Sequence, residues 1–425
     1  MIKTAEVWIW ETFVGAIHWD EKRQLARFQY DSKFQEKGWD LSPFKMPISQ
    51  GIRTYEFPEL RKGENSQDDT YRGLPGLFAD CLPDRFGTQL MDIWQERNGK
   101  MNSIEQLCFI GNRGMGALEY RPADDKNDDS NAILEIDRLV EVGHMALHRM
   151  SLNAREEEFL EQWIRIGTSA GGARPKAVIA YNERTGEIKT GHGAMDPSFE
   201  PWLIKFDGVS GAQFGESLGW GQVEYAYYLM AKECGIDMME CQTIHDGKRV
   251  HFMTKRFDRG INNEKHHTQT LCAMQHYDYN RLQAFSYEQL FETITDLGLT
   301  DQEKEQMFRR MVFNVIATNY DDHTKNFAFR LKKGGRWELT PAYDVCYAYD
   351  PTNNWVNQQT LSVNGKHSGI SKADLMTIAY TNNINRGEEI IDQIIRVVKG
   401  WSDFATKVEV DEKKKKEIRR NLNLL

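Results

Sequence analysis

A helix-like apolar segment, Phe313-Asn314-Val315-Ile316-Ala317-Thr318-Asn319, runs directly into the polar loop Tyr320-Asp321-Asp322-His323-Thr324-Lys325-Asn326-Phe327. Within this loop Asp321 and Asn326 are five residues apart. A carboxylate can orient a hydroxyl nucleophile and accept its proton, and an amide oxygen can bind Mg²⁺. Lys325 could offset negative charge on a phosphoryl group during transfer. The loop therefore indicates phosphoryl-transfer chemistry; the alternative is a polar turn after a helix.

The step from Asp321 to Asn326 is the D-x-x-x-x-N spacing of a protein-kinase catalytic loop, in which the aspartate acts as the base. Asp322 is adjacent, but only Asp321 has this spacing to Asn326. After a predicted strand and a turn comes Leu339-Thr340-Pro341-Ala342-Tyr343-Asp344-Val345, in the place of the kinase metal-binding aspartate. Mg²⁺ prefers one or two carboxylates with phosphate oxygens and water, so Asn326 and Asp344 are the predicted metal ligands. A lone aspartate in a turn is otherwise only a turn former.

A lysine interrupts an apolar predicted strand at Pro201-Trp202-Leu203-Ile204-Lys205-Phe206. Such a lysine is costly unless an anion pairs with it, and protein kinases place one there to hold nucleotide phosphates. Glu224 lies on an apolar stripe of the predicted helix Gly221–Cys234 and is the candidate partner. The alternative is a solvated lysine at a strand edge and a surface glutamate.

Small residues dominate the stretch Gly167-Thr168-Ser169-Ala170-Gly171-Gly172-Ala173-Arg174-Pro175-Lys176. They leave consecutive backbone N–H groups open to an anion, and Lys176 could add a positive charge for phosphate. The stretch is not a Walker A motif, because Gly-Lys-Ser/Thr is missing. A flexible glycine loop between two elements is the other interpretation.

Composition narrows the class of protein. At roughly 150 residues per domain, 425 residues predict two or three packed units. The 54 basic and 63 acidic side chains give a formal charge of −9, which argues against nucleic-acid binding over the whole surface. No apolar stretch predicts a membrane helix, and Glu6 and Glu11 argue against a signal peptide, so we expect a cytoplasmic protein without a membrane partner. No two cysteines form a CxxC pair, so all six are expected to be reduced and buried: Cys81, Cys108, Cys234, Cys241, Cys272 and Cys346.

The acidic segment RPADDKNDDSN at 121–131 is the best linker candidate. We therefore predict an N-terminal subdomain at 1–125, a region with the phosphate loop and Lys205 at 126–259, and a helical region with the catalytic loop at 260–425. Expected strands are Val7–Trp10, Ala16–Trp19, Ala26–Tyr30, Ala177–Tyr181, Trp202–Phe206, Val250–Arg256 and Phe327–Leu331. Expected helices are Arg85–Arg97, 133–165, Gly221–Cys234, most of the chain from 285, and Val408–Leu425; His266 and His267 are expected in a loop.

Taken together, these segments resemble the HipA family of serine/threonine kinases, the toxins of bacterial type II toxin–antitoxin pairs. The resemblance covers nearly the whole chain. It is carried by Phe78-Ala79-Asp80-Cys81-Leu82-Pro83-Asp84-Arg85, by 166–177, by the hinge-like Arg256-Phe257-Asp258-Arg259, by Asp321–Phe327 and by Tyr343-Asp344. It implies an α/β (α+β), protein-kinase-like two-lobed fold with a β-rich N-terminal subdomain and a mainly helical C-terminal lobe. ATP and Mg²⁺ would lie between the lobes.

The resemblance also implies a role for each matching residue. Asp321 would be the catalytic base, Asn326 and Asp344 would hold Mg²⁺, and Glu224 would support Lys205 by an ion pair. Ser169 matches the serine that family members phosphorylate on themselves, with Thr168 as a neighbouring hydroxyl. Pro175 has no N–H, and Arg174-Pro175 replaces the Gln-Glu of better-known members, so phosphate contacts would differ there. The implied nucleotide-binding residues are Gly171, Gly172, Ala173, Arg174, Pro175, Lys176, Lys205, the backbone of Lys255, Arg256 and Phe257, and His323, Lys325, Asn326 and Tyr343.

The implied partners are a protein substrate and a helix-turn-helix antitoxin, with DNA reached only through that antitoxin. Aminoacyl-tRNA synthetases are the substrate class that the resemblance implies, but no residue selects one. Two other classes stay open: a kinase of a small molecule, and a non-catalytic nucleotide-binding or partner-binding module. The run Lys413–Lys416 is expected to be a solvated helix face, with a weak nucleic-acid or partner contact as its alternative.

Overall fold

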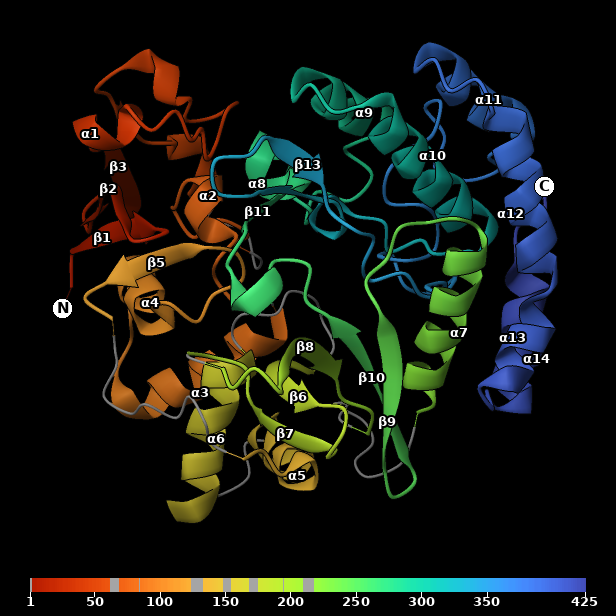
Figure 1. Ribbon diagram of the computed structural model, residues 1–425, viewed down its shortest axis with the longest axis horizontal. Coiled ribbons are helices and arrows are strands. Elements are labelled where there is room, and N and C mark those ends of the chain that lie inside the picture. The colour runs from red at the N-terminus through yellow and green to blue at the C-terminus, as the bar shows by residue number, and fades with distance from the viewer. Residues whose placement is uncertain are drawn as a thin grey trace.

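The computed structural model describes residues 2–61, 69–83, 85–123, 133–147, 154–167, 175–193, 195–208 and 218–425. The predicted boundary near 125 and residues 168–174 lie outside these ranges, so the predicted division of the chain stays a prediction. Across the described ranges, strands form three antiparallel sheets. Figure 1 shows the N-terminal sheet on one side, the second sheet below it and the C-terminal helices on the far side.

The N-terminal sheet has the order β4-β3-β2-β1-β5. Its strands alternate buried and exposed side chains, as in Ala5, Val7 and Ile9 of β1, which is typical of a sheet with one face on the core. Helix α4 begins at a capping box formed by Asn102 and Glu105. The elements are β1 Thr4–Ile9, β2 Thr12–Asp20, β3 Leu25–Tyr30, α1 Ser32–Gln35, η1 Ile48–Gln50, β4 Thr54–Tyr55, η2 Pro58–Leu60, α2 Gly76–Ala79, α3 Arg85–Asn98, α4 Ser103–Ile110 and β5 Leu118–Arg121.

The second sheet has the order β7-β6-β8-β10-β9 and carries helix α7. Gly221 lets α7 lie close to β10, because a Cβ at this position would fall 2.1 Å from the Val250 carbonyl oxygen. Trp163 and Trp202 are buried in an apolar cluster between this sheet and α3, α5 and α6. The elements are α5 Ile136–Leu147, α6 Ala154–Gly167, β6 Lys176–Asn182, β7 Glu187–Thr190, β8 Glu200–Lys205, α7 Trp220–Glu233, β9 Cys241–Asp246 and β10 Arg249–Lys255.

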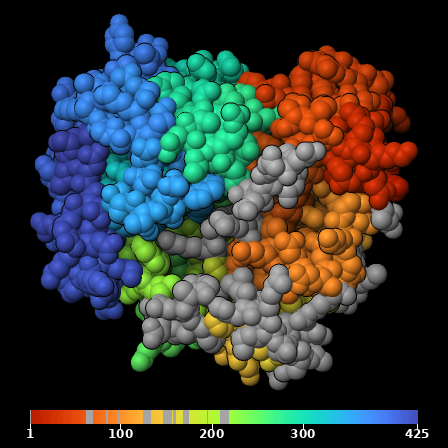
Figure 2. All heavy atoms as spheres, turned by 180° about the vertical axis from the view of Figure 1, so that it is seen from behind, coloured from red at the N-terminus to blue at the C-terminus, as the bar shows by residue number. Residues whose placement is uncertain are grey.

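The C-terminal part packs helices around α10, in which every residue from Met307 to Ile316 is buried. After α10, Thr318 has a positive φ of 57° and turns the chain into the polar loop. The N-terminal sheet and these helices share one large apolar cluster, so the N-terminal subdomain packs directly on the C-terminal part. Figure 2 shows both at one face of the molecule, coloured red and blue. The elements are η3 Ile261–Asn263, β11 His267–Thr270, α8 Leu271–Gln275, α9 Tyr287–Asp296, α10 Asp301–Ile316, η4 Thr324–Asn326, β12 Ala328–Leu331, β13 Trp337–Leu339, α11 Lys372–Thr381, α12 Gly387–Lys399, α13 Trp401–Lys407 and α14 Glu412–Asn421.

Most predicted elements are present within one to four residues of their expected ends, and all six cysteines are free and buried as predicted. Two predictions are wrong. His267 lies in β11 and not in a loop, where its buried ring packs 5.5 Å from the Trp337 ring. The segment 340–371 forms no helix, because its backbone bonds instead to other segments, as Tyr320 and Ala348 show. None of the described helices is long and apolar enough to cross a membrane.

Candidate active site

The centre of the site is an ion cluster around Lys205 at the end of β8. The Lys205 ammonium bonds to the Glu224 carboxylate of α7 and to the Asp344 carboxylate, so the predicted pair of Lys205 and Glu224 is present. Glu224 is only 3% exposed, which Gly221 permits by letting α7 approach the sheet. Burial opposes the charge on Lys205, but Asp344 and Glu224 outweigh it and raise the pKa of this lysine.

A second lysine reinforces this cluster. Lys176 pairs directly with Lys205 across strands β6 and β8, although like charges in such pairs repel. Its ammonium lies 3.9 Å from an Asp344 oxygen, and the residue is 3% exposed. Burial would raise the pKa of Asp344, but Lys176 and Lys205 hold it well below its usual range. The cluster therefore holds two lysines and two carboxylates whose charges balance, and its ammonium groups can contact phosphate oxygens in exchange for their contacts with Asp344.

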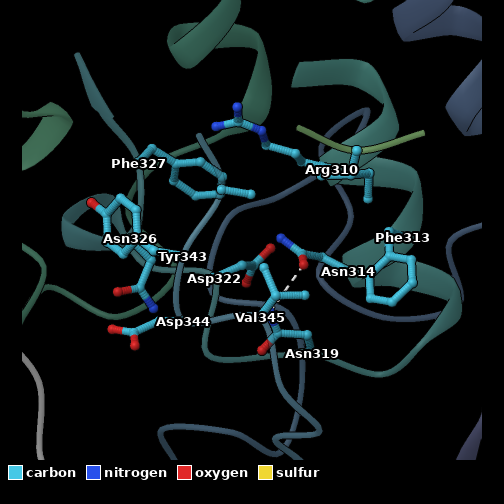
Figure 3. A pocket seen from close by; sticks show the side chains of 12 residues that line it. Arg310, Phe313, Asn314, Asn319, Asp322, Asn326, Phe327, Tyr343, Asp344 and Val345 are labelled. Atoms are coloured by element: carbon cyan, nitrogen blue, oxygen red, sulfur yellow. Dashed lines mark hydrogen bonds between the residues drawn. The ribbon is translucent and has the colours of Figure 1, made fainter. Parts of the chain in front are cut away.

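Asp344 adopts a left-handed backbone conformation with φ of 52°, which aspartate tolerates better than most residues. The neighbouring Tyr343 hydroxyl donates to the Lys325 carbonyl at 2.6 Å. This bond ties the predicted metal-binding segment to the catalytic loop, and the two segments line one pocket (Figure 3).

In the catalytic loop, the Asn326 side-chain amide donates to the Asp321 carbonyl at 2.7 Å. The Oδ1 oxygen of the same Asn326 amide can therefore bind a cation. The Asp321 side chain is 46% exposed, and one of its carboxylate oxygens lies 3.7 Å from the His323 ring nitrogen Nε2. Asn326 and Asp344 lie on the same side of the pocket in Figure 3. The structure thus brings the predicted base and both predicted metal ligands into one region.

Asp322 has a different environment from Asp321. It is 1% exposed and accepts hydrogen bonds from the Tyr287 hydroxyl at 2.8 Å and the Thr360 N–H at 2.7 Å. Burial raises its pKa to about 7, although these donors oppose the shift. Asp322 therefore holds the loop in place. Because it is buried, Asp321 is the better candidate for contact with the hydroxyl group of a substrate.

Replacing Asp322 by asparagine is expected to change the pH dependence of stability and to leave ATP binding intact. Since its pKa rises from 3.8 to about 7 on folding, the wild type binds the extra proton only when folded. Its free energy of unfolding should therefore fall, relative to the variant, by about 2–4 kcal/mol between pH 4 and 7. Urea unfolding of both proteins across this range measures the difference. A difference independent of pH would contradict the assignment.

The hinge-like residues follow β10. The side chains of Lys255 and Arg256 are engaged in ion pairs, Lys255 with Glu200 and Glu240, and the buried Arg256 with Asp258. A nucleotide would therefore meet the main chain here, or the Phe257 ring, which lies 5.3 Å from the Tyr343 ring.

Several predicted residues cannot be placed. Thr168, Ser169, Gly171, Gly172, Ala173 and Arg174 lie outside the described residues. Pro175 is described, and its carbonyl accepts the Phe206 N–H at 2.9 Å, which joins the end of the glycine loop to the strand of Lys205.

Sequence reasoning missed an aromatic group beside the catalytic loop. The Tyr279 ring lies 5.3 Å from the His323 ring and 6.2 Å from the Trp355 ring, and the Lys325 ammonium lies 4.9 Å from its centre. Long-range contacts of this kind leave no periodic signal in the sequence.

Comparisons with known proteins show the family of this chain. The family model of the HipA-like C-terminal domain matches residues 168–401, more than half of the chain, and that of the HipA N-terminal domain matches residues 5–121. The chain belongs to the HipA family. This HipA-family chain is similar to a solved structure of the Shewanella oneidensis MR-1 HipA, HipB and operator DNA complex over 98% of its length and 96% of that chain. The TM-score is 0.68 and the identity 16%. The fold is therefore the predicted kinase-like, two-lobed α/β fold.

Two other proteins resemble parts of this HipA-family chain. A Haemophilus influenzae protein named "Putative kinase" is 31% identical over 136 residues, which cover 28% of this chain and 39% of that protein. The chain thus spans well under two thirds of the length of this relative. The Helicobacter pylori proinflammatory kinase CtkA aligns with 60% of this chain and 90% of its own, at 12% identity and a TM-score of 0.36.

Proposed function

We propose that this HipA-family chain is an ATP- and Mg²⁺-dependent serine/threonine protein kinase that acts as a toxin. The observation that carries the proposal is the convergence of Lys176 and Lys205 on Asp344, beside the loop of Asp321 and Asn326. Buried cations, a carboxylate of lowered pKa and an exposed second carboxylate are the parts that phosphoryl transfer requires.

The residues fit a nucleotide with its metal ion. Asp344 is held ionised by the lysines, and Asn326 presents its amide oxygen on the same side of the pocket. Asp344 and Asn326 would hold Mg²⁺, which when bound would supply positive charge for the phosphate oxygens. Lys205 and Lys176 would then exchange their contact with Asp344 for contacts with the phosphates. The main chain of Lys255, Arg256 and Phe257 would face the adenine ring of the nucleotide. The phosphates would lie beside His323, Lys325 and Tyr343.

Asp321 would accept the proton of the acceptor hydroxyl, since its carboxylate is the exposed one of the adjacent pair. The acceptor would be a serine or threonine of a protein, with an aminoacyl-tRNA synthetase as one class to test. The matched HipA structure contains HipB and operator DNA. By analogy, we propose a helix-turn-helix antitoxin as the partner of this chain, with DNA reached through that partner.

We also propose that the kinase phosphorylates itself at Ser169, in the loop that ends at Lys176. A phosphoserine adds roughly −1.5 to −2 charges, which would compete with ATP for Lys176 and Lys205. Phosphorylation at Ser169 would therefore reduce ATP binding and silence the enzyme.

One experiment tests the proposed function as a whole. The wild type and Asp321→Asn are incubated with Mg-ATP and cell extract, and the products are analysed by intact mass and phosphopeptide mapping. We expect protein phosphorylation and Ser169 modification with the wild type alone. Label on a small molecule would instead indicate a metabolite kinase. ATP binding without any transfer would indicate a non-catalytic module, and modification of Thr168 alone would relocate the regulatory hydroxyl.

Replacing Asp344 by asparagine is expected to weaken Mg-ATP binding by at least about tenfold, because the site loses its only charged metal ligand among the assigned residues. Affinity for ATP without Mg²⁺ should stay the same or rise, since Lys176 and Lys205 lose a competing carboxylate. Calorimetric titration with and without Mg²⁺ measures both, with the exposed Asp403→Asn of α13 as control. An unchanged Mg²⁺ dependence would show that Asp344 is not a metal ligand.

A further inference from the structure

The segment Phe78–Arg85 carries the family resemblance, yet none of the roles above uses it. Asp80 of this segment ends helix α2 in the N-terminal subdomain. Its two carboxylate oxygens accept the backbone N–H of Thr270 at 2.7 Å and the Thr270 hydroxyl at 2.8 Å. A residue of the N-terminal subdomain thus contacts the C-terminal lobe 190 residues away in sequence.

Thr270 is the N-cap of α8, and its hydroxyl oxygen accepts the Ala273 N–H at 3.2 Å. Figure 1 shows α2 lying beside α8. Two more hydrogen bonds reach α8 from the N-terminal subdomain: the Tyr71 hydroxyl, from the segment before α2, donates to the Cys272 carbonyl at 3.0 Å, and the Gly76 N–H of α2 donates to the His276 ring at 3.1 Å. Asp80 thus holds the start of α8, next to Leu271, whereas Tyr71 and Gly76 contact the middle and the end of this helix.

Helix α8 in turn holds the catalytic loop at both ends of η4. The Leu271 N–H donates to the Phe327 carbonyl at 2.8 Å, one residue after Asn326. The Thr324 hydroxyl donates to the Tyr277 carbonyl at 2.7 Å, just after α8. A displacement of α8 would therefore move Lys325 and Asn326, which lie between these two bonds.

Charge supports the same connection. Burial raises the pKa of Asp80, and Lys325 acts against this shift, so the carboxylate lies within the electrostatic reach of the catalytic-loop lysine. The Lys325 ammonium itself lies 4.9 Å from the centre of the Tyr279 ring.

We propose that Asp80 is a positioning residue for phosphoryl transfer: through Thr270 and α8 it holds η4 so that Lys325 and Asn326 face the nucleotide. This inference rests on the proposed function. It means that the N-terminal subdomain helps to position residues of the C-terminal lobe for phosphoryl transfer.

The test compares Asp80→Ala and Asp80→Asn with Tyr71→Phe, which removes a hydrogen bond to the same helix without removing a charge. We expect both Asp80 variants to lower the rate of phosphoryl transfer at least about tenfold, because small misplacements of catalytic groups cost up to about a hundredfold. The dissociation constant for ATP without Mg²⁺ should stay within about twofold of the wild-type value, since Lys176 and Lys205 keep their places, and Tyr71→Phe should transfer phosphate normally. In a Lys325→Met background the effect of Asp80→Asn should shrink, as expected for residues that act together.

Hydrogen exchange provides a readout that does not need activity. The backbone N–H of Asn326, which donates to the His323 carbonyl, should exchange its hydrogen faster in Asp80→Ala than in Tyr71→Phe. Transfer rates of the Asp80 variants within twofold of Tyr71→Phe would overturn the proposal. If the wild type phosphorylates no acceptor, the proposed function has failed, and exchange alone decides: faster exchange supports positioning by Asp80, and equal exchange overturns it.

Discussion

Asp321→Asn is expected to reduce phosphoryl transfer by about 10²–10⁴-fold while ATP affinity stays within about twofold of the wild-type value. The reason is the geometry of the loop. The Asp321 carboxylate is 46% exposed, whereas the Asp321 carbonyl holds Asn326 at 2.7 Å. Substituting the side chain removes the proton acceptor and leaves the bond that orients Asn326. Single-turnover transfer and calorimetric ATP titration measure the two quantities separately.

The matched control for this prediction is Asp350→Asn, an exposed aspartate in the turn that follows the site. It should transfer phosphate at the wild-type rate. If Asp321→Asn stays active while Asp322→Asn is folded and inactive, the base is Asp322, and its hydrogen bonds to Tyr287 and Thr360 must break during turnover.

The second large effect is expected at Asp258, which is fully buried between two arginines. Its carboxylate accepts from Arg256 and Arg259 at 2.7 Å each and from the Gly116 N–H at 2.7 Å. Asp258→Ala should lower the free energy of unfolding by about 3–5 kcal/mol, because it leaves two buried guanidinium groups without their anion. Chemical denaturation measures this loss.

An exposed ion pair provides the control for Asp258. Glu388→Ala removes the solvent-exposed contact with Lys372 and should lower the free energy of unfolding far less than Asp258→Ala. Burial would raise the pKa of Asp258, but the arginines hold it well below its usual range. Its contribution to stability should therefore persist above about pH 4 and be lost only in stronger acid. Equal losses for Asp258→Ala and Glu388→Ala would show that the buried cluster is not what joins the hinge to Gly116.

The sequence alone was enough to single out the residues that the structure brings together around Lys205 and Asp344. The step from Asp321 to Asn326, the lysine within an apolar strand and the glutamate on an apolar helical stripe are local patterns. The lysine and the glutamate each place a charge among apolar residues, so each needs a partner or a function. Alternation of side chains in strands and helical spacing in segments such as α7 and α10 are local as well, which is why the main elements were predicted correctly. The strands β5, β7, β9, β11 and β13 were missed because each contains at most two apolar residues, too few to form a recognisable run.

Only the tertiary structure decided which of these residues lie together. The pairing of Lys176 with Lys205 depends on the register of β6 and β8, and the burial of Glu224 depends on Gly221 letting α7 approach β10. The difference between Asp321 and Asp322 arises because Tyr287 and Thr360, distant in sequence, enclose one carboxylate and not the other. The contact between Asp80 and Thr270 likewise joins segments that no local pattern connects. Burial and charge at a site are set by neighbours from remote segments, and these neighbours exist only once the chain has folded.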